Sequence, residues 1–346
     1  MSQASGQLAP AAHGRIRCFL TSLCLVGLFL ASEALADAGD DLRAGLRAHA
    51  DRQFDEAIDH FTAAIESGAL SRELLASAYY RRGASWARKS SWSAAIADLD
   101  QSLDLNPTFG PAYAERARAH FATAVYEQAA EDIAEAIEKQ GGDVDSYLLQ
   151  AEIFMVKGRS SEAIKAYGEA LAYDARNAEA YRGRGNAFRL LGDPDKAIAD
   201  LTRAIDIKAK FLAARVQRSH AHRAKGQWSA AAADLDAALR LEPENTDLYR
   251  LRGEALLADG ELVRAIDDFT TVLRLDPQRA DIYHQRARSY MVHKDPDAAL
   301  GDLEAAIRLE PTPQRYLDRG MVLHTAPCGP CSTMAFLTVA PRGSIT

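Results

Sequence analysis

Residues Tyr249–Pro277 read YRLRGEALLADGELVRAIDDFTTVLRLDP, and their pattern determines how the chain folds. It has an aromatic residue, a small residue four positions on, and later an Ala followed by a large apolar residue and Pro. The same pattern returns every 34 residues from residue 76 onward, after a first copy that begins at residue 38. Four extra residues separate the first two copies, within residues 68–75. Internal repetition therefore sets the organisation of residues 38–313, because a repeat array has no single core.

Fixed positions within the 34-residue repeat predict its structure. Position 8 is small and position 20 is Ala in all eight copies, whereas position 24 is large. Positions 4, 8 and 11 share one helical face, and positions 20, 24, 27 and 28 share a face of a second helix. The segment between them often contains Gly, and Pro at position 32 ends the second helix in four copies. Each repeat is predicted to be an antiparallel helix pair.

This pattern resembles the tetratricopeptide repeat (TPR) family in its period and in its aromatic, small, Ala and Pro positions. The resemblance implies an all-α fold, a right-handed α-solenoid of eight 34-residue helix-turn-helix repeats plus an incomplete ninth. The expected repeats are 38–71, 76–109, 110–143, 144–177, 178–211, 212–245, 246–279 and 280–313. Residues 314–323 restart a ninth repeat, as a first helix only, through Tyr316, Arg319, Gly320 and Leu323.

Residues 324–346 depart from the repeat pattern. They are expected to form a divergent, disordered tail, because no second helix of the kind seen in the eight repeats follows the ninth first helix. A truncation or a frame shift in the source gene is the other explanation of this tail.

Position 7 departs from the family, which usually has Leu there. Six repeats have Arg at position 7, and the same six have Asp at position 23. Repeats 1 and 4 lack both charges. Because Arg and Asp come and go together, we predict an ion pair inside each of the six repeats, although duplication of one ancestral repeat would also copy both residues. This structural Arg–Asp ladder comprises Arg82–Asp98, Arg116–Asp132, Arg184–Asp200, Arg218–Asp234, Arg252–Asp268 and Arg286–Asp302.

The resemblance also implies that the first helix of each repeat lines an inner groove. Positions 5, 6, 9, 12 and 13 would face it, and they hold many arginines and no lysine, opposed by Glu115, Glu152 and Glu254. Arg suits two-point recognition of carboxylates, so a groove for an acidic, extended peptide is predicted. A general preference for Arg on exposed helices is the alternative. The predicted partner-binding residues are Arg43, Tyr80, Arg81, Arg88, Arg118, Phe121, Arg182, Asn186, Arg189, Arg223, Arg250 and Arg288.

The N-terminus predicts export. Arg15 and Arg17 precede an uncharged apolar run over residues 18–30, and Ala34-Leu35-Ala36 fits a signal-peptidase site. Residues 1–36 are therefore interpreted as a secretory signal peptide, which places the protein in the periplasm if the source is bacterial. The run is short for a membrane-spanning helix, and an uncleaved anchor is the alternative.

No catalytic, metal or cofactor site is predicted, because the chain has no G-x-S-x-G, phosphate loop or HExxH motif. Cys328-Gly329-Pro330-Cys331 resembles the thioredoxin dithiol but lacks its preceding Trp and strand. A disulfide between Cys328 and Cys331, or an idle pair, is the favoured interpretation. With a net charge of −7 and no Lys/Arg block, general nucleic-acid binding is excluded.

The sequence thus predicts a non-catalytic scaffold for protein–protein interaction, without a cofactor and without membrane association after signal cleavage. Its partner would be a protein or peptide, acidic in character. Two alternatives stay open. The chain could be a subunit or truncated form of an enzyme, or exchange disulfides through Cys328 and Cys331. It could also form an oligomer through its uncapped C-terminal end.

Overall fold

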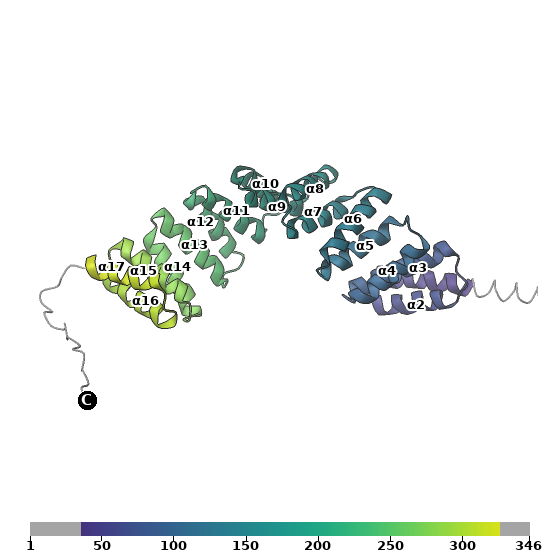
Figure 1. The fold of residues 1–346 in the computed structure, drawn as a ribbon, viewed down its shortest axis with the longest axis horizontal. Coiled ribbons are helices and arrows are strands. Elements are labelled where there is room, and N and C mark those ends of the chain that lie inside the picture. The colour runs from purple at the N-terminus through teal and green to yellow at the C-terminus, as the bar shows by residue number, and fades with distance from the viewer. Residues whose placement is uncertain (1–35, 326–346) are drawn as a thin grey trace, which may run out of the picture. The chain divides into compact units, whose positions relative to one another are not determined.

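In a computed structural model that describes residues 36–325, every regular element is an α-helix, which confirms the predicted all-α class (Figure 1). Most of the predicted signal segment lies outside the described residues, as do Cys328 and Cys331. The chain divides after Leu191 into two compact bodies. They are called the N-terminal body and the C-terminal body below, and each is described by itself.

The N-terminal body opens with a helix over residues 36–50. It continues with α2 (Phe54–Glu66), α3 (Arg72–Arg88), α4 (Trp92–Leu105), α5 (Gly110–Ala122), α6 (Tyr126–Gln140), α7 (Val144–Val156), α8 (Ser160–Tyr173) and α9 (Ala178–Leu190). The C-terminal body contains α10 (Pro194–Ile207), α11 (Leu212–Ala224), α12 (Trp228–Leu239), α13 (Thr246–Asp259), α14 (Leu262–Leu275), α15 (Ala280–His293), α16 (Pro296–Leu309) and α17 (Pro313–Thr325). The last helix, α17, reaches Thr325, two residues beyond the expected end at residue 323.

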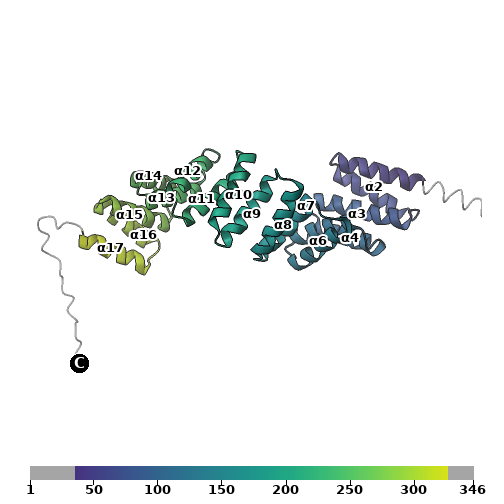
Figure 2. The same cartoon turned by 90° about the horizontal axis from the view of Figure 1, so that it is seen from above.

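Within each body, a helix packs chiefly against the helices that precede and follow it in the chain (Figures 1 and 2). The first helices of successive repeats are also in contact: α3 contacts α5, and α13 contacts α15. The core follows the repeat columns, because the Ala at position 20 is fully buried throughout, as in Ala95, Ala129 and Ala265. Each helix pair therefore completes its core only by stacking on the next.

Position 8 is small because it faces the large side chain at position 24. A Cβ added to Gly83 would lie 3.1 Å from Leu99 Cγ, and one added to Gly253 would lie 2.8 Å from Phe269 Cε1. Leu99 and Phe269 are fully buried. Position 8 is thus a notch in the first helix that receives a side chain from the second.

The turn between the two helices of a repeat has one conformation throughout. Position 15 has a positive φ in all eight repeats, between 59° and 86°. Glycine suits this left-handed region, yet only half of the repeats have it there. The eight residues are Arg52, Ser90, Ala124, Gly158, Gly192, Gly226, Gly260 and Lys294.

The four extra residues between the first two repeats extend a helix. Ser71 caps the N-terminus of α3 by accepting a hydrogen bond from the Leu74 N–H at 3.3 Å, so α3 is 17 residues long. Arg72 Nε then donates to the Leu105 carbonyl at the end of α4, at 2.9 Å. The insertion therefore forms a first helical turn that caps its neighbour.

Arg at position 7 and Asp at position 23 are joined by two parallel hydrogen bonds in five repeats. Arg Nε and Nη2 each donate to one carboxylate oxygen, at 2.7–2.9 Å and 2.6–2.7 Å. The Asp side chains are only 5–9% exposed, so the pairs are largely shielded from water. The sixth pair, Arg184 and Asp200, is split between the two bodies and stays a prediction.

The ladder also has a link between repeats that the sequence reasoning missed. Arg Nη1 donates to position 25 of the preceding repeat, as Arg252 does to Asp236 Oδ1 at 2.6 Å and Arg286 does to Thr270 Oγ1 at 2.9 Å. Where position 4 is Tyr, its ring lies against the same guanidinium, with Arg252 Cζ 5.5 Å from the Tyr249 ring centre; the repeat of Arg218 has Arg215 there instead. The remaining partners at position 25 are Thr62, Asp100 and Thr202. Each such arginine therefore joins its own helix pair to the one before it.

Candidate functional site

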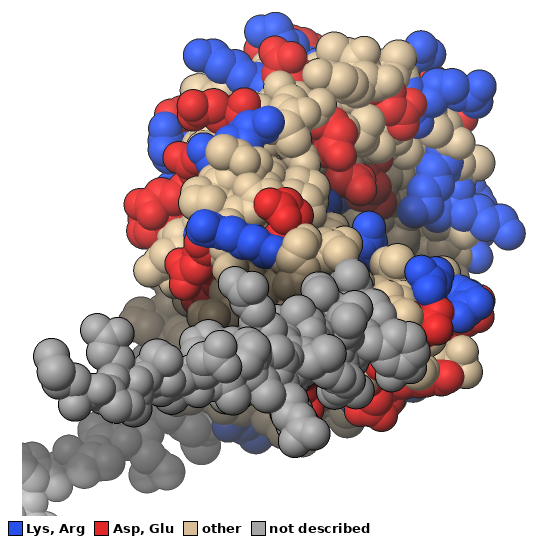
Figure 3. All heavy atoms as spheres, turned by 90° about the vertical axis from the view of Figure 1, so that its right-hand side faces the viewer, with Lys and Arg blue, Asp and Glu red and all other residues tan. Residues whose placement is uncertain are grey.

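The first helices of the repeats present the predicted groove residues in two groups, one in each body. In the N-terminal body, α3 contacts α5, and α5 contacts α7. Positions 5, 9 and 12 on these helices therefore lie beside one another. On the molecular surface near the first repeats, basic and acidic side chains are interspersed (Figure 3).

The first group is the N-terminal cluster, defined as His49, Tyr80, Arg81, Arg88, Glu115 and Arg118. Glu115 lies at its centre with a side chain that is only 8% exposed. Its Oε1 accepts from Arg118 Nη1 at 3.2 Å and from Arg88 Nη2 at 3.4 Å. One carboxylate thus partly offsets two of the predicted groove arginines.

The third arginine of the cluster keeps its charge available. Arg81 has no carboxylate partner among residues 36–325, and its Cζ lies 5.2 Å from the Tyr80 ring centre. Tyr80 in turn meets the edge of Phe109 at 5.0 Å between ring centres. Burial, reinforced by Glu115, raises the pKa of the Tyr80 hydroxyl. The cluster therefore offers a guanidinium on an aromatic platform.

His49 was not among the predicted partner-binding residues, although it occupies position 12 of the first repeat, one of the positions expected to face the groove. Its Nδ1 lies 2.8 Å from Ser85 Oγ. Burial lowers the pKa of the His49 imidazole, and the positive charges of Arg81 and Arg88 lower it further. The cluster thus holds three arginines, one glutamate and a histidine whose neutral form is favoured, which leaves it net positive.

Several other predicted groove residues are engaged by near neighbours in the chain. Arg43 pairs with Asp40, and Arg182 Nε donates to Glu179 at 2.8 Å. Arg189 Nη2 donates to Asn186 Oδ1 at 2.9 Å, so these two occupy each other. Phe121 is partly buried against the core rather than free in a groove.

The second group lines a hollow in the C-terminal body, called the C-terminal pocket. Its volume is about 460 Å³, and it lies between α11, α12, α13 and α15. Eight of the nine lining residues stand at positions 6, 9, 12 or 13 of their repeats. The lining residues are Arg223, Trp228, Glu254, Leu257, Ala258, Gln285, Arg288, Met291 and Val292.

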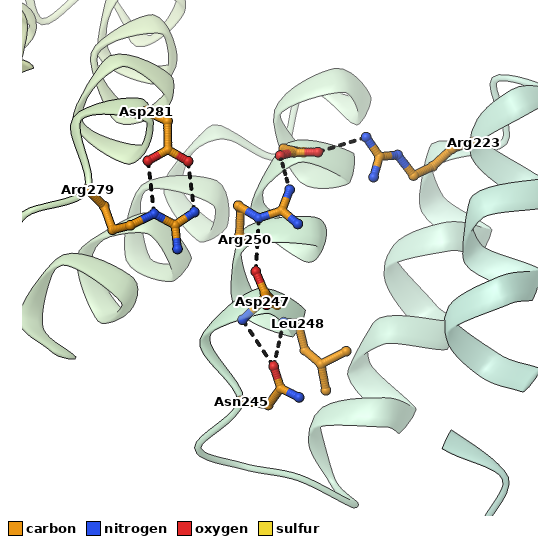
Figure 4. A network of polar contacts seen from close by, with 8 residues as sticks. Arg223, Asn245, Asp247, Leu248, Arg250, Arg279 and Asp281 are labelled. Atoms are coloured by element: carbon orange, nitrogen blue, oxygen red, sulfur yellow. Dashed lines mark hydrogen bonds and ion pairs between the residues drawn. The ribbon is translucent and has the colours of Figure 1, made fainter. Parts of the chain in front are cut away.

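Glu254 lines this pocket and joins Arg223 to Arg250; its carboxylate is the unlabelled group between those two arginines in Figure 4. Its Oε2 accepts from Arg223 Nη2 at 2.8 Å, and its Oε1 accepts from Arg250 Nη1 at 2.7 Å. Arg250 also reaches Asp247 Oδ1 at 3.3 Å. Both arginines are therefore held in place, and their charge is largely offset.

Arg288 is the cation of the pocket that has no carboxylate partner within the described range 36–325. Its Nη1 donates only to Gln285 Oε1, at 3.3 Å. Met291 and Leu257 line the same hollow, and Val292 is 60% exposed beside them. The pocket thus combines one available guanidinium with apolar walls.

The structure thus changes the predicted groove by showing where its charge is offset. Arg223 and Arg250 share the Glu254 carboxylate, Arg88 and Arg118 share that of Glu115, and Arg250 also pairs with Asp247. Trp228, Leu257 and Gln285, which give the pocket its apolar and amide lining, were not among the predicted groove residues, because that prediction rested mainly on the arginines. Two of these three stand in the predicted groove positions, which was the signal available.

No group of three or more His, Cys, Asp or Glu residues between residues 36 and 325 is placed to hold a metal ion. Over the same residues, no helix has the length and apolar character that crossing a membrane requires.

Comparison with known proteins identifies the repeats. A family model described as tetratricopeptide repeat matches residues 42–108, 114–170, 148–210 and 216–280, which together exceed half of the chain.

Among solved structures, YrrB, described as a TPR protein with an unusual peptide-binding site, is 24% identical with a TM-score of 0.51. The match covers 56% of this chain and 99% of YrrB. The C-terminal part of a TPR repeat-containing protein from Cytophaga hutchinsonii is 19% identical with a TM-score of 0.61, over 69% of this chain and 98% of that one. A Parabacteroides merdae tetratricopeptide repeat protein is 15% identical with a TM-score of 0.52, over 72% and 98% of the two chains. These likenesses show the fold.

Proposed function

Because the chain belongs to the tetratricopeptide repeat family, whose repeats generally mediate protein–protein interaction, we propose that it is a scaffold that binds an acidic, extended segment of a partner. The observation that carries the proposal is the C-terminal pocket, where Arg288 lacks a carboxylate partner among the described residues and stands beside Met291 and Leu257. A peptide with a carboxylate next to an apolar side chain complements both features. Arg81 on the Tyr80 platform supports the same preference in the N-terminal cluster.

The paired arginines have a second role in this proposal. Glu254 fixes Arg223 and Arg250, and Glu115 fixes Arg88 and Arg118. A guanidinium that is already ordered loses less side-chain entropy when a ligand arrives. In each body the paired arginines would therefore shape the local binding surface, while Arg81 in one and Arg288 in the other supply the charge that a carboxylate meets.

Fluorescence anisotropy with short labelled peptides tests this function. Peptides of alternating Glu and Leu should bind the full chain more tightly than peptides of alternating Lys and Leu, and added salt should weaken the binding. Arg288→Glu should weaken binding of the Glu–Leu peptide about tenfold, whereas the matched control Arg308→Glu, on the exposed side of α16, should not. Equal binding by the two variants would contradict the proposal.

We also propose that this binding takes place in an exported compartment. The support is the pattern of residues 1–36, with its basic start, apolar run and small residues before Asp37. N-terminal sequencing of the protein recovered from an exporting bacterial host tests it. A mature chain that begins at Asp37 is expected, and recovery of the full N-terminus from the cytoplasm would overturn the assignment.

A further inference from the structure

The final helix, α17, buries one side and leaves the other open. Arg315, Asp318 and Val322 are buried against the preceding repeat, and Asp318 Oδ2 lies 2.5 Å from His284 Nε2. The open side has four large apolar side chains that are 45–59% exposed. They are Tyr316, Leu317, Met321 and Leu323.

Gly320 occupies the notch position of this helix. Position 8 is buried in all eight complete repeats, where it faces the large residue of the second helix. Gly320 stands at the same position but is exposed, and a Cβ added to it would have no described atom within 4 Å. A hollow of about 450 Å³ lies there, lined by Tyr316, Leu317, Gly320, Met321 and His324. The notch therefore has room for a large side chain.

Arg319 stands at position 7, beside the notch. Its Cζ lies 5.4 Å from the Tyr316 ring centre, as Arg252 Cζ lies 5.5 Å from the Tyr249 ring centre. Arg252 is completed by Asp268, directly before Phe269 in the chain. Arg319 has the same stacking partner, but no carboxylate pairs with it among residues 36–325. On α17, both the notch at Gly320 and the Arg319 guanidinium thus lack the partners that the second helix supplies in the complete repeats.

We infer that this face of α17 binds a helix of a partner protein in which Asp is followed directly by a large apolar residue, with a small residue three positions before the Asp. The five described repeats that pair Arg with Asp show how such a helix packs, with Asp on the guanidinium and the apolar residue over position 8.

The occupant is assigned to another protein for two reasons. In a second copy of this chain the matching residues are already used, since Asp268 is 3% exposed and Phe269 is fully buried. Residues 326–346 contain no Asp or Glu, so no side-chain carboxylate among them can pair with Arg319.

A synthetic peptide of α14, Glu261–Pro277, is a suitable probe, because it carries Ala265, Asp268 and Phe269 in the required spacing. Labelled peptide is titrated into the full chain and followed by anisotropy. Saturable binding is expected. Asp268→Asn in the peptide, or Arg319→Ala in the protein, should each weaken it about tenfold, and combining the two should cost little more.

Two further variants test the notch. Gly320→Phe fills the hollow and should abolish binding, while circular dichroism stays unchanged because residue 320 faces outward. Arg308→Ala, on α16, is the matched control and should bind like the wild type.

Absence of saturable binding would overturn the inference. So would Arg319→Ala and Gly320→Phe variants that bind the peptide as tightly as the wild type does. Binding that appears only after removal of residues 326–346 would show that the chain's own tail covers the face. Light scattering could also show a mass that rises with protein concentration. If Gly320→Phe abolished that rise, a second copy of this chain would be the molecule that covers the face.

Discussion

Single residues in this protein work as parts of a repeated contact. The Arg252 guanidinium meets Asp268, Asp236 and the Tyr249 ring at once, and the hydrogen bonds to Asp268 raise the pKa of Arg252. Burial pushes the pKa of the Asp268 carboxyl upward while Arg252 pulls it down. We regard the pair as ionised at neutral pH, because both oxygens accept charge-assisted hydrogen bonds, at 2.6 and 2.8 Å.

Arg252→Ala leaves the shielded Asp268 carboxylate without this partner, so it should lower the free energy of unfolding by about 2–4 kcal/mol. Asp268→Ala should lower it by less, because Arg252 still donates to Asp236. Because both remove the same contact, the double-mutant cycle should give a coupling of about 1–3 kcal/mol. Urea unfolding measures it. Gln150→Ala, at position 7 of a repeat without the Asp, is the matched control and should change stability little. A coupling near zero would mean that the pair does not stabilise the repeat.

His49 makes the stability of the N-terminal body depend on pH. Its folded-state pKa is lowered from the ordinary value of 6.5, first by burial and then by Arg81 and Arg88. The unfolded chain therefore takes up this proton first as the pH falls. The stabilisation from neutral His49 is complete above the unfolded-state pKa and is lost as the pH falls through 6.5 toward the lower folded-state value.

Urea unfolding on both sides of this pH range, compared between the wild type and His49→Gln, isolates the effect. The wild type should lose more free energy of unfolding on acidification than the variant does. An equal loss in both proteins would contradict the assignment. A bound carboxylate beside His49 would favour its protonated form, so the acidic ligand should also reduce the difference.

At the scale of helices, the period of 34 residues was enough to predict the helix pairs, because small and large residues alternate at fixed positions. It did not predict that residues 72–75 would extend α3, since an insertion between repeats is as compatible with a loop as with a helical turn. Nor did it predict the left-handed turn residue where the sequence has Arg52, Ser90, Ala124 or Lys294. The stacked helices impose that backbone whether or not glycine is present.

The turn before α6 therefore carries a strain that can be removed. Ala124 has φ of 59°, a region that costs residues with a side chain about 1 kcal/mol or more relative to glycine. Ala124→Gly should raise the free energy of unfolding by about 0.5–1 kcal/mol, measured by urea denaturation. Gly158→Ala, the reverse change in the next repeat, should lower it by a similar amount, because open space surrounds that residue. A destabilised Ala124→Gly protein would contradict this account.

The candidate site was predicted in outline only. Its positions followed from the repeat, and the C-terminal pocket is built almost entirely from them. Which arginines remain available to a ligand was not predictable. Glu254 pairs with Arg250 on its own helix, α13, but also with Arg223 on another helix, α11. Such a contact depends on how neighbouring repeats stack, and spacing within one repeat does not contain that information.

For the molecule as a whole, the net charge of −7 contrasts with the first helices of two repeats, on which Arg81 and Arg288 have no carboxylate partner in the described part of the chain. An acidic body repels acidic ligands in general, so binding of an acidic segment must come from local contacts. We therefore expect Arg81 and Arg288 to decide whether the protein prefers an acidic or a basic peptide, and substitution of surface arginines elsewhere to leave that preference unchanged.

A charge-reversal experiment shows whether Arg81 and Arg288 select an acidic partner. Anisotropy is measured for the wild type, for Arg81→Glu/Arg288→Glu, and for the surface control Arg274→Glu/Arg308→Glu, each with the Glu–Leu and the Lys–Leu peptide. The wild type and the control should prefer the Glu–Leu peptide. Arg81→Glu/Arg288→Glu should lose that preference and bind the Lys–Leu peptide at least as well. If this variant still prefers the acidic peptide as strongly as the wild type does, these arginines do not select the partner and the proposed mode of binding is wrong.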